Sequence, residues 1–157
     1  MLSAVSSRLA RERTFAASSI VRAGLCLAIM ITGLALRGFG LSFGLPALVV
    51  KYGGSVLWAT MVFFLVAIAA PHRSRRSIAL MTAAIAICVE LFRLVHAPWL
   101  DAFRLTLAGA LLLGRIFSLW NLLAYGVGIV LGVGLDRLGM SAFTTGPSAP
   151  PTPHSAS

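Results

Sequence analysis

Four long apolar stretches constrain the fold of this chain more than any other feature of its sequence. They cover residues 20–36, 56–70, 77–95 and 119–135. About 20 apolar residues in a helix cross a hydrocarbon core roughly 30 Å thick, and a helix satisfies its own backbone polar groups there. Charged residues make up 11% of the chain, whereas a soluble domain has roughly 25%. The sequence therefore predicts an all-α integral membrane protein with four transmembrane helices.

Proline, glycine and serine mark where these helices are expected to begin and end. Pro46 suits the first turn of a short helix, and we expect Gly53 and Gly54 to break that helix. Ser55 then caps the second span, which Pro71 stops. The third and fourth spans are bounded in the same way, by Ser77, Pro98, Ser118 and Asp136.

The two ends of the chain differ in composition from its apolar part and define three regions. Residues 1–19 are basic and rich in Ser and Ala, which predicts a mobile tail or a short helix on the membrane surface. Residues 20–138 form the four-span domain. The first apolar stretch lacks a small-x-small cleavage site, so we expect it to be an uncleaved span. Residues 139–157 are rich in Pro, Ser and Thr, which predicts a disordered tail.

Arginine predicts how the chain crosses the membrane, because short cytoplasmic loops carry an excess of Lys and Arg. With the N-terminus inside, eight basic residues lie on the cytoplasmic side and five outside. The cytoplasmic set is Arg8, Arg11, Arg13, Arg22, Arg73, Arg75, Arg76 and Arg137, and the outer set is Arg37, Lys51, Arg93, Arg104 and Arg115. We therefore predict cytoplasmic N- and C-termini. Because Arg outnumbers Lys twelve to one, as in GC-rich bacteria, the predicted location is a bacterial inner membrane.

Between the third and fourth spans lies a segment too short to cross the membrane. Asp101 is a good N-cap and Gly114 a good helix stop, so residues 102–113 are predicted to be helical. At 1.5 Å per residue this helix covers only about 18 Å. We expect a re-entrant or interfacial helix on the outer side.

Much of the charge in the apolar part of the chain lies between Glu90 and Asn121. An ionisable side chain costs roughly 2.5–3.5 kcal/mol to insert into hydrocarbon, so each one needs a reason. Glu90 and Arg93 can pair across one helical turn, either as an ion pair that makes both tolerable or as a functional pair. Arg104 and Arg115 either extend to the headgroups from the two ends of the short helix or form a basic pocket for a phosphate or carboxylate.

Structural roles are predicted for the other residues whose side chains could bind a metal or take part in catalysis. His96 is expected at the membrane interface beside Trp99, and Asp101 is expected to act only as a helix cap. Cys26 and Cys88 lie near opposite membrane faces in this topology, so neither a disulfide nor a zinc site is predicted. No serine nucleophile with an adjacent base stands out, and we predict no metal, cofactor or catalytic group.

Membrane lipids are the expected partners of the chain. Gly128 and Gly132 have the small-xxx-small spacing that lets helices approach closely, either within the chain or in a homo-oligomer. The net charge of +9 does not indicate nucleic-acid binding, because the basic residues stand singly between apolar runs and no nucleic-acid-binding motif surrounds them.

Several motifs resemble those of a bacterial membrane family. They are KYGGSVLWA at 51–59, HAPWLDAFR at 96–104 and LLLGRIFSLWNLLAYGVGI at 111–129, together with the spacing of Glu90 and Arg93. Residues 25–138 resemble the family known as domain of unknown function 2809 and, more distantly, the VanZ-like membrane proteins. The resemblance implies a small multi-span inner-membrane protein without an established activity. Through the VanZ-like group it implies a role in the cell envelope.

The chain departs from the pattern of that family at three positions. Ser55 stands where relatives typically have Asp, Arg93 where they have Gln, and Asn121 where they have Asp. All three changes are toward positive charge. They imply a lost function if the family site binds a cation, and stronger binding if the site takes an anionic lipid.

These observations lead to one site hypothesis and two alternatives. We predict a non-enzymatic membrane protein whose outer pocket binds an anionic lipid or a cell-wall-precursor headgroup. The predicted pocket residues are Lys51, Glu90, Arg93, Arg104, Arg115 and Asn121. One alternative is a subunit of a small homo-oligomeric transporter or channel. The other is a lipid-modifying enzyme with Glu90 as general base.

Overall fold

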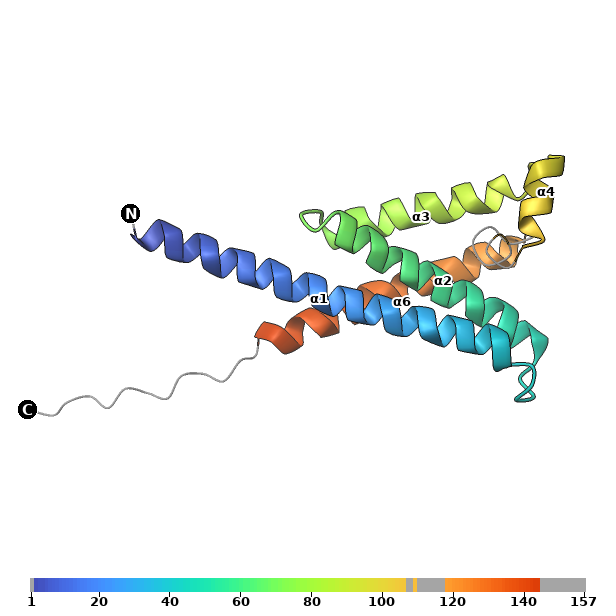
Figure 1. Ribbon diagram of the computed structural model, residues 1–157, viewed down its shortest axis with the longest axis horizontal. Coiled ribbons are helices and arrows are strands. Elements are labelled where there is room, and N and C mark those ends of the chain that lie inside the picture. Colours follow the sequence, from blue (N-terminus) through green and yellow to red (C-terminus); the bar gives the residue numbers. More distant parts are fainter. Residues whose placement is uncertain (1, 107–108, 110–117, 145–157) are drawn as a thin grey trace, which may run out of the picture.

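A computed structural model of the chain describes the backbone of residues 2–106, 109 and 118–144, and side chains within 17–106, 109 and 118–141. All regular structure in these ranges is helical. The helices are α1 (Leu2–Phe39), α2 (Ala47–Ala69), α3 (Arg75–Phe92), α4 (Pro98–Arg104) and α6 (Leu119–Thr144). In Figure 1 the first turn of α1 and the last turn of α6 lie toward one end of the molecule, and α4 lies at the other.

Three of these helices are long and apolar enough to cross a membrane. The candidate spans are Ala17–Phe39 in α1, Ala47–Ala69 in α2 and Leu119–Ser141 in α6. The remaining predicted span forms α3, which has 18 residues and includes Arg75, Arg76 and Glu90. The described part of the chain is therefore all-helical, and the length and composition of its helices give three candidate spans. The assignment of α3 stays open.

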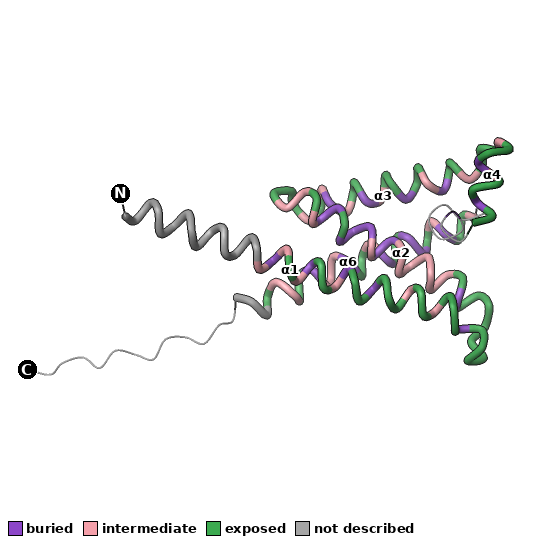
Figure 2. Tube along the Cα trace, viewed as in Figure 1, coloured by how far each residue is buried: buried purple, intermediate pink, exposed green. Residues whose placement is uncertain are grey.

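Large apolar side chains face outward along the long helices. Ile20 of α1, Leu80 of α3 and Val130 of α6 are all more than 70% exposed, at 72%, 71% and 73%. Exposed residues line the outer sides of the helices in Figure 2, and buried residues gather where α2 meets its neighbours. A soluble monomer rarely exposes a continuous apolar surface of this extent, whereas hydrocarbon accommodates it.

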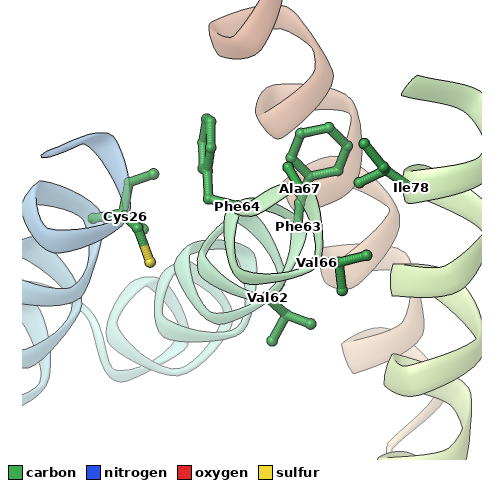
Figure 3. Packing of buried hydrophobic residues seen from close by; sticks show 8 residues of the cluster. Cys26, Val62, Phe63, Phe64, Val66, Ala67 and Ile78 are labelled. Carbon is green, nitrogen blue, oxygen red and sulfur yellow. The ribbon is translucent and has the colours of Figure 1, made fainter. Parts of the chain in front are cut away.

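α2 is the central helix and contacts α1, α3 and α6. Its Phe63, Phe64 and Ala67 are completely buried. Figure 3 shows these side chains together with Cys26 from α1 and Ile78 from α3. The sides of α2 that carry these residues therefore form the core on which the other helices pack.

Two glycines of α6 allow its close approach to α2. A Cβ atom at Gly128 would lie 2.3 Å from the carbonyl oxygen of Val56, and one at Gly132 would lie 2.8 Å from the ring of Phe63. The small-xxx-small face therefore packs within the chain, which was one of its two predicted uses. A homo-oligomer through this face stays a prediction that the packing does not favour, because α2 already covers both glycines.

Two predicted helix boundaries in the first half of the chain are wrong. α2 runs without a break through Gly53, Gly54 and Ser55, and Ser55 is therefore not a cap. A glycine costs about 1 kcal/mol in a helix, but unpaired backbone groups in hydrocarbon cost more. Residues 1–19 were expected to form a mobile tail or a short surface helix, but residues 2–19 are the first part of the continuous helix α1.

The boundaries in the second half also differ from prediction. α3 begins at Arg75 with Ser74 as its N-cap, since the Ser74 hydroxyl accepts the backbone N–H of Ser77. The short helix α4 starts at Pro98, so Asp101 lies inside its first turn and is not its cap. Pro98 suits this first position because its missing N–H has no helical partner there. α4 ends at Arg104, and half of the predicted helix 102–113, together with the stop at Gly114, lies outside the described residues. α6 continues beyond Asp136 to Thr144.

Candidate functional site

Glu90 occupies the last turn of α3 and is completely buried. Four donors surround its carboxylate. Nη1 of Arg93 lies 2.6 Å from Oε2, and the hydroxyl of Tyr125 donates to the same oxygen at 3.1 Å. The backbone N–H of Ser118 donates to Oε1 at 2.7 Å, and Nδ2 of Asn121 does so at 3.3 Å. A buried carboxylate is tolerable only when it is paired and hydrogen-bonded in this way.

The donors come from two helices whose ends meet. Arg93 is the C-cap of α3, so its side chain can return to Glu90 three residues earlier. Asn121 and Tyr125 lie one turn apart on α6 and therefore share a face. Ser118 precedes α6, where the first backbone N–H groups have no partner within the helix. The start of α6 thus supplies three donors to the end of α3.

Two further contacts extend this network. Nη2 of Arg93 donates to the Tyr125 hydroxyl oxygen at 3.0 Å, so the tyrosine accepts from the cation and donates to the anion. The Ser55 hydroxyl oxygen of α2 lies 3.3 Å from Oδ1 of Asn121 and 3.3 Å from the Lys51 carbonyl oxygen. We call Ser55, Glu90, Arg93, Asn121 and Tyr125 the Glu90 cluster, and this part of the bundle the Glu90 end.

The Glu90 cluster is electrically balanced, with one carboxylate and one guanidinium. The side chain of Arg93 is 10% exposed and that of Glu90 is not exposed at all. Because both carboxylate oxygens already accept hydrogen bonds, Glu90 is poorly placed to take a proton from a substrate. The arrangement is better suited to joining three helices, with the charge of Glu90 neutralised inside the protein.

The predicted pocket residues separate into three groups. Glu90, Arg93 and Asn121 are brought together. Lys51 is exposed, one turn before Ser55 on α2, and its Nζ lies 5.1 Å from the centroid of the Tyr52 ring. Arg104 and Arg115, the remaining two, are not assigned to the cluster, and Arg115 lies outside the described residues.

Arg104 has a role that neither predicted alternative described. Its side chain is 3% exposed, and it donates to the carbonyl oxygens of Phe92 at 2.7 Å and Val95 at 2.8 Å. Nη1 also lies 2.9 Å from Oδ1 of Asp101. Arg104 therefore binds carbonyl groups at and just after the end of α3 and holds α4 against α3.

His96 and Asp101 lie near the surface. The side chain of His96 is 72% exposed, and its Nδ1 is 3.5 Å from Oδ1 of Asp101. Trp99 is 70% exposed. The position of His96 and Trp99 at the membrane interface stays a prediction.

A second buried ion-pair network went unpredicted. Asp136 of α6 is 1% exposed and pairs with Arg22 of α1 at 2.8 Å and with Arg75 of α3 at 2.7 Å. We call these three residues the Asp136 cluster, and their part of the bundle the Asp136 end. Asn121 and Asp136 are 15 residues apart on α6, about 22 Å along the helix. The two clusters therefore lie near opposite ends of the bundle.

Tyr125 was also missed, although the sequence held a signal for it. It follows Asn121 by four residues, which places both side chains on one face of α6. Arg22 and Asp136 are 114 residues apart in the chain, and no local spacing connects them.

Comparison with known families gives one match. Residues 44–129, just over half of the chain, match the model of the family described as Protein of unknown function (DUF2809). The matched region contains the whole Glu90 cluster and ends before Asp136. No solved structure matches this chain significantly.

Proposed function

The chain belongs to the DUF2809 family of proteins of unknown function, and we propose that it is a non-enzymatic, four-span membrane protein that binds an anionic headgroup at the Glu90 end. Three steps support this: the assignment of α3 as a span, the orientation of the bundle, and the charge at the Glu90 end.

The position of α3 supports its assignment as the fourth span. It packs against both α2 and α6, which are candidate spans. Its 18 residues cover about 27 Å, close to the roughly 30 Å of a hydrocarbon core. Its charged residues lie at its two ends, where Arg75 joins the Asp136 cluster and Glu90 joins the other.

The distribution of arginine supports an orientation with the Asp136 end in the cytoplasm. That end carries five arginines among the residues with described side chains: Arg22, Arg73, Arg75, Arg76 and Arg137. Cytoplasmic segments are enriched in such residues. The Glu90 end then faces the outside of a bacterial inner membrane.

The observation that carries the binding proposal is the internal neutralisation of Glu90. Because Arg93 already pairs with this carboxylate at 2.6 Å, the Glu90 cluster does not require an external cation. Lys51 lies about 6 Å before Ser55 along α2, is exposed, and has no carboxylate partner among the described residues. A phosphate at this position would meet uncompensated positive charge beside a cluster rich in hydrogen-bond donors.

The departures from the family pattern agree with this preference. Three residues of the Glu90 cluster stand at positions where relatives are expected to carry Asp or Gln. These residues are Ser55, Arg93 and Asn121. An anion is therefore a better ligand for this chain than a cation. A cell-envelope role of the VanZ-like kind stays a prediction drawn from the resemblance.

Tryptophan fluorescence provides a direct test, because the three tryptophans lie toward the Glu90 end. The rings of Trp58 and Tyr125 are tilted against each other, with centroids 5.3 Å apart. Trp120 directly precedes Asn121, and Trp99 is in α4. The protein in phosphatidylcholine vesicles is titrated with brominated phosphatidylglycerol or brominated phosphatidylcholine, which quench nearby indoles. We expect preferential quenching by the anionic lipid. Lys51→Gln should weaken this preference about fivefold, the effect of one basic residue at a membrane surface.

Arg37→Gln is the matched control, because Arg37 is an exposed arginine at the end of α1 on the same side of the bundle. It should leave the quenching preference unchanged. Competition with unbrominated polyprenyl phosphate separates a cell-wall carrier lipid from a general preference for phospholipid. Equal quenching by both brominated lipids, or an unaltered preference in Lys51→Gln, would contradict the proposed site.

A transporter is the second candidate, because buried ion-pair clusters occur near both ends of the same helices. Alternate opening of two such clusters would expose a path to one side at a time. Because one copy of the chain has so few spans, several copies would have to assemble to form a transport pathway. A strictly monomeric protein in mild detergent would count against this function.

A further inference from the structure

The Asp136 cluster joins four helices at one buried carboxylate. Arg22 of α1 donates from Nε to Oδ1 of Asp136 at 2.8 Å and from Nη2 to Oδ2 at 3.4 Å. Its Nη1 donates to the carbonyl oxygen of Ala67 in α2 at 3.1 Å. Arg75 of α3 donates from Nε to Oδ2 at 2.7 Å. All three nitrogens of Arg22 are therefore engaged within the protein.

Arg75 differs from Arg22 in how much of its guanidinium is used. Only its Nε contacts Asp136, and its side chain is 42% exposed, against 10% for Arg22. Among the described residues we find no partner for its two terminal nitrogens. An arginine fork binds carboxylate or phosphate with two parallel hydrogen bonds, and the two terminal nitrogens of this partly exposed side chain form such a fork.

The cluster also lacks negative charge. Two guanidinium groups share one carboxylate, which leaves a net charge of plus one at the end of a largely apolar bundle. The surrounding residues do not supply the missing anion, because the neighbouring exposed charged groups are basic: Arg73, Arg76 and Arg137, with His72 close by. An external anion would therefore meet uncompensated positive charge here.

We propose that Arg75 and its neighbours Arg73 and Arg76 bind the phosphate of an anionic phospholipid in the leaflet at the Asp136 end. Asp136 holds the Arg75 guanidinium in place through Nε, so its terminal nitrogens are positioned before the lipid arrives. Leu80 is 71% exposed and follows Arg76 by four residues on the same face of α3. An acyl chain can therefore lie along α3 below the bound phosphate, which favours a lipid over a soluble phosphate.

This inner site is independent of the headgroup site proposed at the Glu90 end. The test is native mass spectrometry of the full-length protein carrying Lys51→Gln, which weakens the other proposed site. The protein is extracted from membranes containing equal amounts of phosphatidylglycerol and phosphatidylcholine. We expect retained phosphatidylglycerol in preference to phosphatidylcholine. Adding Arg75→Gln should lower its retention about fivefold, the effect expected for one arginine near a headgroup.

Arg37→Gln is again the matched control, since it removes one exposed arginine at the opposite end of the bundle. It should leave phosphatidylglycerol retention unchanged. Retention in Arg75→Gln equal to that of the parent, or equal retention of the two lipids by the parent, overturns the inner site. Displacement of the lipid by excess glycerol 3-phosphate also overturns it, because a soluble anion would then suffice.

A second variant protects the test against misfolding, since Arg75 also ties α3 to Asp136. The double variant Arg73→Gln/Arg76→Gln leaves the Asp136 cluster intact. If thermal unfolding shows that Arg75→Gln is not folded, the double variant decides the outcome. Reduced phosphatidylglycerol retention supports the inner site, and unchanged retention refutes it.

Discussion

Removing the Arg93 side chain should destabilise the protein more than neutralising Glu90. Glu90 is completely buried, and its Oε2 lies 2.6 Å from Nη1 of Arg93. Arg93→Ala leaves the carboxylate charged and buried, with neutral donors alone around it. Leaving one member of a buried ion pair without its partner lowers the free energy of unfolding by about 3–5 kcal/mol.

Glu90→Gln removes the charge that needs a cation but keeps a side chain of the same shape. Its amide oxygen can still accept the backbone N–H of Ser118, and Arg93, with a 10% exposed side chain, can turn toward headgroups or water. The loss is that of charge-assisted hydrogen bonds, about 1.5–3 kcal/mol. The double variant Glu90→Gln/Arg93→Ala has no unpaired charge, so it should be more stable than Arg93→Ala.

Equilibrium unfolding of the purified protein in mild detergent, followed by far-ultraviolet circular dichroism, measures these differences. Arg37→Ala removes an exposed arginine from the same end of the bundle and should change the free energy of unfolding by less than about 0.5 kcal/mol. If Arg93→Ala costs less than Glu90→Gln, or if the double variant equals the sum of the singles, the carboxylate does not depend on Arg93.

Two further predictions concern helix packing and the second ion-pair network. Gly128→Ala should lower the free energy of unfolding by about 1–3 kcal/mol, because its Cβ would overlap the Val56 carbonyl. At Gly126 a Cβ would meet open space, so Gly126→Ala should be neutral or stabilising. Equal effects of the two variants in the same unfolding assay would contradict this prediction. Asp136→Asn should cost about 3–5 kcal/mol, because buried Arg22 loses its anionic partner. Asp101→Asn should cost clearly less, because its parent carboxylate is 46% exposed and buried Arg104 keeps its bonds to the carbonyl oxygens of Phe92 and Val95. A reversed order would show that burial of the carboxylate does not set these costs.

The long helices follow from hydropathy because membrane-spanning segments must be both apolar and internally hydrogen-bonded. That same requirement explains the error at Gly53 and Gly54. In water these glycines favour a break, since solvent can bond the freed backbone groups. Within α2 no such replacement is available, and the helix continues through both glycines.

The candidate site was predictable only where its contacts are local. Glu90 and Arg93 pair because they are three residues apart on one helix, and this spacing is visible in the sequence. The contacts of Arg104 could not be predicted, because its partners include the backbone carbonyl groups of Phe92 and Val95, and every residue carries such a group. Ser55 meets Asn121 only because α2 and α6 pack in one register, and no single-helix pattern encodes that register.

The two ion-pair clusters provide the register that apolar surfaces leave undetermined. In hydrocarbon, one apolar helix surface is about as favourable against lipid as against another helix, so sliding between helices has a low cost. A one-turn slide of α6 would move its Asp136 away from Arg22 and Arg75 and its Tyr125 away from Glu90. Each of these losses leaves a charged or polar group without its partner in a region that tolerates this poorly. Arg75, which is part of the proposed inner site, therefore also fixes the helices that present it. Variants in either cluster must be compared with exposed-arginine controls before a loss of binding is assigned to the ligand.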